Sequence, residues 1–268
     1  MPASASDKTS IKALIIGDVI GQPGCRAVFF SLPQLIKSLS PDLVVVNGEN
    51  AADGFGITEE IATKIFAAGA HVITTGNHIW QKQDSYPYMD SEPRLLRPLN
   101  YPPGVPGHGS FELQLAGTSI LVANLQGRAQ LPSTDCPFRA TDELLRRSKA
   151  AVKIVDFHAE LTAEKEAFAL DFDGRLTAVL GTHTHVTTAD ERVLPRGTAY
   201  ITDMGASGPR HSVIGFDPAI SVRRSLTQLP LRNEVLDAPA VLHGVLVHAD
   251  TKTGHAQAIE RITHASML

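Results

Sequence analysis

Short apolar runs rich in β-branched residues recur through the first two thirds of the chain and predict buried strands. Most of them are separated by stretches whose apolar residues have helical spacing. Three of these stretches carry a threonine near the start, Thr58, Thr141 and Thr162, which predicts side-chain caps for the helices. The expected strands are residues 12–16, 43–47, 71–74, 120–124, 153–157 and 176–181, and the expected helices are residues 26–39, 58–68, 141–150 and 162–170. This alternation predicts an α/β fold.

The pattern changes after about Val193. Short strand candidates follow there at residues 199–202, 240–247 and 257–262, with few helical stretches between them. These strands predict a second sheet. A stretch rich in proline and glycine at residues 98–109 predicts a long surface loop.

Residues able to bind a metal ion follow directly after five of the expected strands. Because the carboxyl ends of strands in an open α/β sheet form one rim, residues far apart in the sequence converge there. The residues are Asp18, Glu49, Asn50, Asn77 with His78, His158, and His183 with His185. The two histidines of THTH are two positions apart, so extended backbone directs both to the same side.

The mixture of imidazole nitrogen with carboxylate and amide oxygen suits divalent ions such as iron, manganese or zinc. Without His78, which has no obvious ligand role, seven candidate ligands remain, and they exceed the three or four that one catalytic ion takes from a protein. The sequence therefore favours two ions that share one bridging carboxylate, for which we choose Glu49.

Two such ions, about 3.5–4 Å apart, produce a hydroxide that attacks phosphorus and stabilise the oxygens on both sides of it. The leaving oxygen still needs a proton, and His78 is the candidate donor because it lies next to a ligand and has no obvious ligand role. Arg128 is a candidate anchor for a substrate phosphate, although an arginine in a turn is commonly solvated. Asp156 and Glu160 flank His158 and either orient it or lie at the surface.

The composition of the 268 residues is that of a globular protein, with 43% apolar and 19% charged residues. A net charge of −4 without a basic cluster argues against a strong nucleic-acid footprint. Two distant cysteines, Cys25 and Cys136, favour a reducing cytoplasm. The sequence contains no uninterrupted apolar run of about 18 residues, so no membrane span is predicted. We expect a disordered tail at residues 1–10, followed by a single domain at residues 11–268.

Five motifs, GDVIGQPG, NGENAADGFG, GNHIW, DFHAE and GTHTHV, resemble in order and spacing the YmdB-like family of calcineurin-type metallophosphoesterases. NLQGR and ITDMGASGP strengthen the resemblance, which covers residues 11 to about 262. It implies a four-layer αββα sandwich of two mixed sheets, a dinuclear iron or manganese centre, and phosphodiesterase activity on 2′,3′- or 3′,5′-cyclic nucleotides. It also places His78 at the position of the proton donor.

The resemblance further implies how the ligands divide. One ion would be held by Asp18, Glu49, Asn50 and His185, and the other by Glu49, Asn77, His158 and His183. The chain departs from the wider superfamily at Asp18, which is not followed by Asp-x-His, and at the Glu49–Asn50 pair. Both departures are shared with the YmdB-like branch, so substrate rules of the wider superfamily do not transfer.

Other functions stay open on the sequence alone. A His-x-His pair also occurs in metal-dependent amidohydrolases, but there it comes on the first strand of a barrel. A regulatory or partner-binding protein that retains the metal site is a second alternative, and a phosphomonoesterase is a third. The expected partner is a small phosphodiester or cyclic nucleotide, no membrane is expected, and a homo-oligomer is possible.

Overall fold

The structure is a computed structural model that describes residues 8–115 and 117–266. Residues 1–7 of the expected tail therefore lie outside the described residues. Inside the remainder of that tail, Lys8 pairs with Asp42 and Ser10 begins the first strand. No helix in the described part of the chain is long and apolar enough to cross a membrane.

The first sheet combines strands from both ends of the chain. Its members are β1 (Ser10–Ile16), β2 (Leu43–Asn47), β3 (Val72–Thr74), β10 (Gly208–Pro209), β11 (Ala240–Asp250) and β12 (Ala256–Ala265). The order is β10-β11-β1-β2-β3, and β12 also pairs with β11. β1, β2 and β3 are parallel, whereas β11 runs antiparallel to β1.

The second sheet lies between these two sets of strands in the sequence. Its members are β4 (Ser110–Leu115), β5 (Thr118–Gln126), β6 (Val152–His158), β7 (Ala178–Thr182), β8 (Arg192–Val193) and β9 (Ala199–Ile201). The order is β4-β5-β6-β7-β9-β8. Its four central strands are parallel and its two edge strands are antiparallel, so both sheets are mixed.

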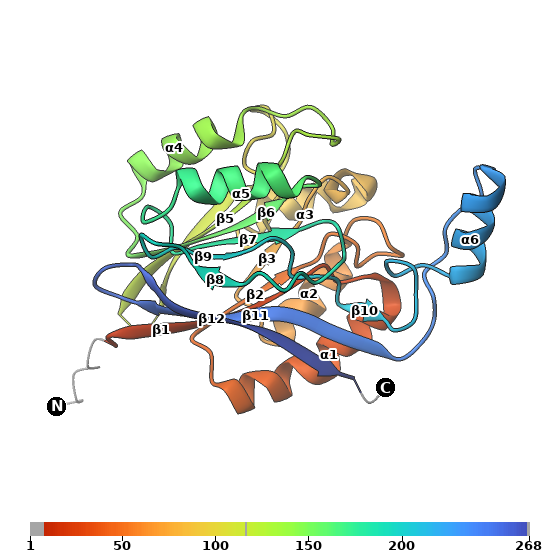
Figure 1. Cartoon of the computed structure of the whole chain (residues 1–268), viewed down its shortest axis with the longest axis horizontal. Helices are drawn as coiled ribbons and strands as arrows, with labels where there is room; N and C mark the ends of the chain where they lie inside the picture. The colour runs from red at the N-terminus through yellow and green to blue at the C-terminus, as the bar shows by residue number, and fades with distance from the viewer. Residues whose placement is uncertain (1–7, 116, 267–268) are drawn as a thin grey trace.

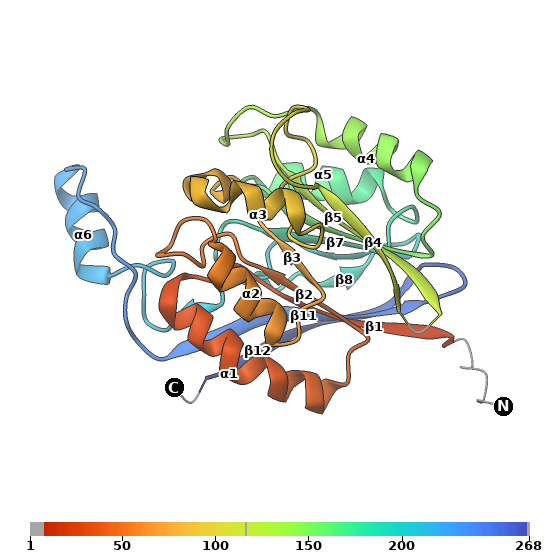
Figure 2. The same cartoon turned by 180° about the vertical axis from the view of Figure 1, so that it is seen from behind.

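Helices cover the outer face of each sheet, which gives four layers (Figures 1 and 2). The helices are α1 (Gly21–Leu39), α2 (Glu59–Ala67), α3 (Tyr86–Ser91), α4 (Pro137–Arg147), α5 (Thr162–Asp171) and α6 (Pro218–Thr227), with the 3₁₀ turns η1 (Ile79–Gln81) and η2 (Gln83–Ser85). α1 and α2 lie against the first sheet, and α4 and α5 against the second.

Alternation along the strands explains how the layers adhere. In β1, Ile11 and Ile15 face the second sheet, where they share a core with Ile120 and Ile154. Leu14 points the other way and packs beneath α1. The inter-sheet core therefore draws apolar side chains from both sheets, and the expected αββα sandwich is confirmed.

Two expectations about local elements are wrong. The strands after Val193 do not form a sheet of their own, because β11 pairs along its length with β1 and carries β12 with it. Among the three threonines, only Thr58 caps its helix, accepting a hydrogen bond from Ile61 N. Thr141 lies one turn inside α4 and donates to Pro137 O, and Thr162 is already the first residue of α5.

Residues 210–239, which connect β10 to β11, project from the body and are here called the arm (Figure 1). The arm carries α6, which the sequence patterns did not predict. Asp217 caps this helix by accepting hydrogen bonds from two backbone N–H groups, and Pro218 takes its first position. No residue from Pro218 to Thr227, all of them described, is buried.

Candidate metal centre

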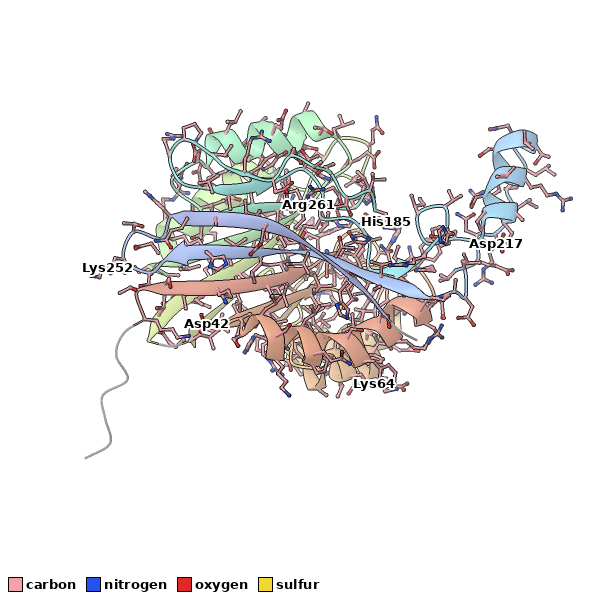
Figure 3. All side chains as sticks on the ribbon, turned by 60° about the horizontal axis from the view of Figure 1, so that its bottom comes forward. Asp42, Lys64, His185, Asp217, Lys252 and Arg261 are labelled. Carbon is pink, nitrogen blue, oxygen red and sulfur yellow. The ribbon has the colours of Figure 1, made fainter. Side chains whose placement is uncertain are left out.

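The seven predicted ligands lie at one edge of the two sheets. They come from the ends of β1, β2, β3, β6 and β7, all of which run parallel to a neighbour. In Figure 3, His185 marks this edge, at the side of the body from which the arm leaves. The turn that carries Lys252 lies at the opposite end of the strands.

Three of the other six side chains gather around His158, which is fully buried. Its Nε2 atom lies 3.2 Å from Asn77 Oδ1, 3.1 Å from His183 Nδ1 and 3.6 Å from Glu49 Oε1. Two atoms that bind the same ion, each about 2.1 Å from it, are themselves about 3 Å apart. The spacing of this group therefore fits the ligands of one ion, and its members are those that the resemblance assigns together.

The other group is less complete. Asn50 Nδ2 lies 3.0 Å from His185 Nε2, but the oxygen of the same amide faces His78 Nδ1 at 2.9 Å. Binding an ion beside His185 through this oxygen requires the Asn50 amide to turn over. Asp18 lies on the side of His183, whose backbone N–H donates to Asp18 Oδ2 at 3.2 Å.

Asp18 Oδ1 is buried and has no hydrogen-bond partner among the described residues. A buried carboxylate oxygen of this kind is available to bind a cation. No three His, Cys, Asp or Glu side chains in residues 8–115 and 117–266 form a group placed to hold one ion. Two of the seven candidates are asparagines, and His158 and His183 contact each other directly.

Each ligand histidine donates one ring N–H to a fixed acceptor. Thr182 Oγ1 lies 3.0 Å from His158 Nδ1 and donates its own proton to the buried Asp156 at 2.7 Å, so it accepts from His158. Thr74 and Asn47 also donate to Asp156. Such partners fix the tautomer of a metal-binding histidine and turn its other nitrogen toward the ion.

The other two histidines are fixed in the same way. His183 Nε2 lies 3.0 Å from Glu160 Oε2, and His185 Nδ1 donates to Ile214 O at 2.9 Å. His158 Nε2 and His183 Nδ1 are thus both left without a hydrogen and face each other at 3.1 Å. Two lone pairs at this separation repel unless a cation lies between them, so the donor set fits a metal ion.

Strained backbone supports these positions. His183, His185 and Ile214 have φ angles of 101°, 66° and 49°, in the left-handed region that side chains disfavour. Beneath the histidines, Asp203 Oδ2 accepts hydrogen bonds from Thr184 N at 3.0 Å and from Thr184 Oγ1 at 2.8 Å. The same oxygen lies 2.8 Å from Lys165 Nζ in a fully buried ion pair.

Glycine is required where the chain passes closest to His158. A Cβ atom on Gly76 would lie 2.2 Å from the Cδ2 atom of the His158 ring. Gly76 N also donates to Glu49 Oε2 at 2.5 Å, so the absence of a side chain lets the backbone hold this carboxylate.

Burial is the main cause of the shifted pKa values among the predicted ligands. It raises the pKa of Glu49 well above its ordinary value, and together with the charge of Asp203 it raises the pKa of Asp18 to about 7. Burial also lowers the pKa of His158, His183 and His185, which keeps their rings neutral, the form that binds metals. A cation among these groups would bring the carboxylate pKa values back down.

His78 lies beside the cluster. Its backbone N–H donates to Glu49 Oε1, its Nδ1 faces Asn50, and its side chain is 27% exposed. Burial, followed by the charges of His183 and His185, lowers its pKa to about 4. The ring is therefore neutral near pH 7 in the free protein.

Arg128 is exposed in the loop after β5, where its backbone N–H donates to Glu164 Oε1 at 2.9 Å. Its guanidinium makes no hydrogen bond or ion pair with a predicted ligand in the described part of the chain, so its role stays a prediction. The motifs did not indicate Thr182, Ile214, Lys165 or Asp203 as supporting residues. Asp203 belongs to ITDMGASGP and Thr182 to GTHTHV, so their positions in these motifs were the available signal.

Known proteins match nearly the whole chain. The model of the YmdB-like protein family matches residues 14–262. A 2′,3′-cyclic-nucleotide 2′-phosphodiesterase from Bacillus subtilis (strain 168) is 44% identical over 254 residues, which are 94% of this chain and 96% of the relative.

Two crystal structures match with a TM-score of 0.91 each. A hypothetical protein from Thermus thermophilus is 41% identical, and the match covers 96% of this chain and all of the other, 100%. A novel phosphatase from Mycoplasma pneumoniae is 38% identical, and the match covers 96% of this chain and 94% of the other.

Proposed function

This chain belongs to the YmdB-like protein family, and we propose on that basis that it is a dinuclear metal-dependent phosphodiesterase that opens 2′,3′-cyclic nucleotides at the 2′ oxygen. The activity of the relative from Bacillus subtilis supports the substrate class. One observation carries the metal dependence: His158 Nε2 and His183 Nδ1 lie 3.1 Å apart, while the other ring nitrogen of each histidine faces its own oxygen acceptor.

The ligand sets follow the division given above. Glu49 would bridge, with Asp18, Asn50 and His185 on one side and Asn77, His158 and His183 on the other. Iron or manganese is the expected metal, and zinc suits the same donors. When bound, the two ions supply a hydroxide at neutral pH and neutralise charge on the phosphoryl oxygens.

The protein's own part is to orient the ligands and to move one proton. With both ions bound, an oxygen derived from water would bond to phosphorus as the bond from phosphorus to O2′ breaks, and the electron pair of that bond would stay with O2′. His78 donates a proton to that oxygen, which leaves a nucleoside 3′-phosphate. An anionic diester beside His78 raises the pKa of the ring, so binding of the substrate favours its protonation.

The test is hydrolysis of 2′,3′-cyclic AMP and bis-p-nitrophenyl phosphate by protein of known metal content. We expect two metals per chain in the wild type and fewer in Glu49→Gln, which removes the shared carboxylate charge. His78→Ala should keep its metal and lose about 10²- to 10⁴-fold in kcat, the range typical of a lost proton donor.

Two variants serve as controls. Glu60→Gln and His255→Ala change exposed residues away from the cluster and should behave as the wild type. Full metal content without cleavage of either diester would contradict the proposal and favour the regulatory alternative. Cleavage of p-nitrophenyl phosphate but of no diester would favour a phosphomonoesterase.

The cytoplasm remains the expected location, and Cys25 and Cys136 are both free thiols in the structure. A homo-oligomer is a state to be tested. Gel filtration with light scattering on the metal-loaded protein gives the state directly.

A further inference from the structure

The loop that follows the ligand Asn50 is turned back on itself and held by its own backbone. Asp53, Gly54 and Gly56 have φ angles of 58°, 88° and 75°, three left-handed residues within four positions. Gly56 N donates to Glu49 O at 2.7 Å, and Ala52 N donates to Gly56 O at 2.8 Å. The one residue between the two glycines, Phe55, is thereby placed at the surface.

Phe55 lies directly beside the proposed proton donor. Its ring centroid is 5.0 Å from that of His78, in an edge contact with an angle of 67° between the rings. One face of Phe55 stacks on Phe216 of the arm, with centroids 5.8 Å apart and an angle of 26°. Phe216 is buried, whereas Phe55 remains 38% exposed. The buried Phe216 therefore supports one face of the Phe55 ring, and part of the Phe55 ring is open to solvent.

Two further exposed apolar side chains lie next to the ligand His185. Val186, which follows the ligand His185, is 58% exposed, and Ile214, whose carbonyl oxygen holds His185, is 49% exposed. A buried polar cluster is thus bordered by exposed apolar groups. This combination fits a ligand that joins a phosphate to an apolar ring.

We propose that Phe55, backed by Phe216, is the surface on which the base of a nucleotide substrate stacks. The inference rests on the proposed function and extends it from the phosphate to the rest of the substrate. In a 2′,3′-cyclic nucleotide the leaving oxygen is on C2′ and the base is on the neighbouring C1′. A group that protonates O2′ therefore lies next to the base, and the aromatic ring of Phe55 contacts His78.

Stacking on Phe55 also predicts which bases the site accepts. Stacking uses the face that every base presents, so the site should accept all four bases. Purines have the larger face and should be bound somewhat more tightly than pyrimidines.

The experiment compares two substrates that have the same five-membered cyclic diester. One is 2′,3′-cyclic AMP, and the other is glycerol 1,2-cyclic phosphate, which has no base. The measured quantity is the ratio of kcat/KM for the first to kcat/KM for the second. We expect Phe55→Ala to lower this ratio about tenfold through KM for the nucleotide, the size typical of a lost base stack. Phe55→Tyr should restore the ratio because it retains the ring.

Phe30→Ala is the matched control, since Phe30 is an exposed phenylalanine on the unrelated helix α1. An equal loss of kcat/KM for both substrates in Phe55→Ala would mean that the ring only supports His78, and would overturn the inference. An unchanged ratio would overturn it as well.

Binding of the product, measured by calorimetry, separates this inference from the proposed function. We expect adenosine 3′-phosphate to bind the wild type at least about tenfold more tightly than glycerol 2-phosphate, and Phe55→Ala to remove most of that difference. If neither cyclic diester were cleaved but the binding difference remained, the proposed function would fail and the stacking surface would stand. Equal binding of both phosphates by the wild type would overturn the stacking surface alone.

Discussion

At the scale of single residues, His71 links the stability of the fold to pH. Its Nδ1 atom accepts a hydrogen bond from Val44 N at 2.9 Å, which requires that nitrogen to be unprotonated. Burial, and then the charge of Arg94, lowers its pKa below the ordinary value of 6.5. As pH falls below 6.5 the unfolded chain takes up the proton first, so stability is lost between 6.5 and the lower folded pKa.

Replacing His71 by Asn keeps an acceptor for Val44 N and removes the titration. We expect urea unfolding of the wild type to show a larger loss of unfolding free energy between about pH 7.5 and 5.5 than His71→Asn shows. The difference should be a few tenths of a kcal/mol and at most about 1, since solvent screens a half-buried ring. His255→Asn, at an exposed position, should keep the wild-type slope, and the same slope in all three proteins would contradict the prediction.

The ligands at the strand ends could be predicted from the sequence, because a buried strand and the polar residue that follows it form a local pattern. An acceptor such as Ile214 O could not, since any residue type has a carbonyl group and the contact spans 29 positions. The same holds for Thr182, whose role arises from its place between Asp156 and His158. The sequence therefore indicates ligands, while the groups that orient them depend on tertiary contacts.

At the scale of elements, α5 supports the loop after β7 from below. Lys165 of α5 and Asp203 are fully buried as an ion pair, and Asp203 also holds the backbone between the two left-handed histidines. Lys165→Met should lower the free energy of unfolding by about 3–5 kcal/mol, because it leaves a buried carboxylate without its partner. It should also weaken metal retention.

The exposed pair Lys64–Glu60 on α2 provides the comparison for this prediction. Lys64→Met should change the free energy of unfolding by no more than about 1 kcal/mol, as is usual for surface pairs. The double variant Lys165→Met/Asp203→Asn should recover part of the loss, since it removes the buried charge. Equal effects of Lys165→Met and Lys64→Met in urea unfolding would show that the buried pair does not support the loop.

Element boundaries could be predicted closely where an apolar run is short and fully buried, as in β2, which spans Leu43–Asn47 as expected. Partners could not. β11 has an apolar pattern that suits either sheet, and only its pairing with β1, far earlier in the chain, assigns it to the first. The cap of α4 was misplaced because Pro137, with its fixed φ, starts the helix a turn before Thr141.

At the scale of the whole molecule, we propose that the two sheets unfold together. They share one core, in which Ile15 and Val245 of the first sheet meet Ile154 and Leu180 of the second. Trp80, the single tryptophan, contacts Tyr101 near the start of the second sheet with ring centroids 5.0 Å apart. Its fluorescence therefore reports on the junction between the two halves.

Thermal or urea unfolding of metal-free protein should give coincident transitions by far-ultraviolet circular dichroism and by Trp80 fluorescence. The calorimetric and van't Hoff enthalpies should agree within error. Two separated transitions would show that residues 11–268 do not behave as a single domain.

The outer part of the arm leaves and re-enters the fold at one point. Phe216 and Val235 form an isolated bridge, and Asp217 N donates to Glu234 O at 2.8 Å. These contacts join the two ends of residues 218–233. They separate this segment from Ile214 and Phe216, which reach the site. Insertions, deletions or whole replacements in this segment leave the strand registers untouched, which makes it the place where evolution or engineering can graft a new module onto the scaffold.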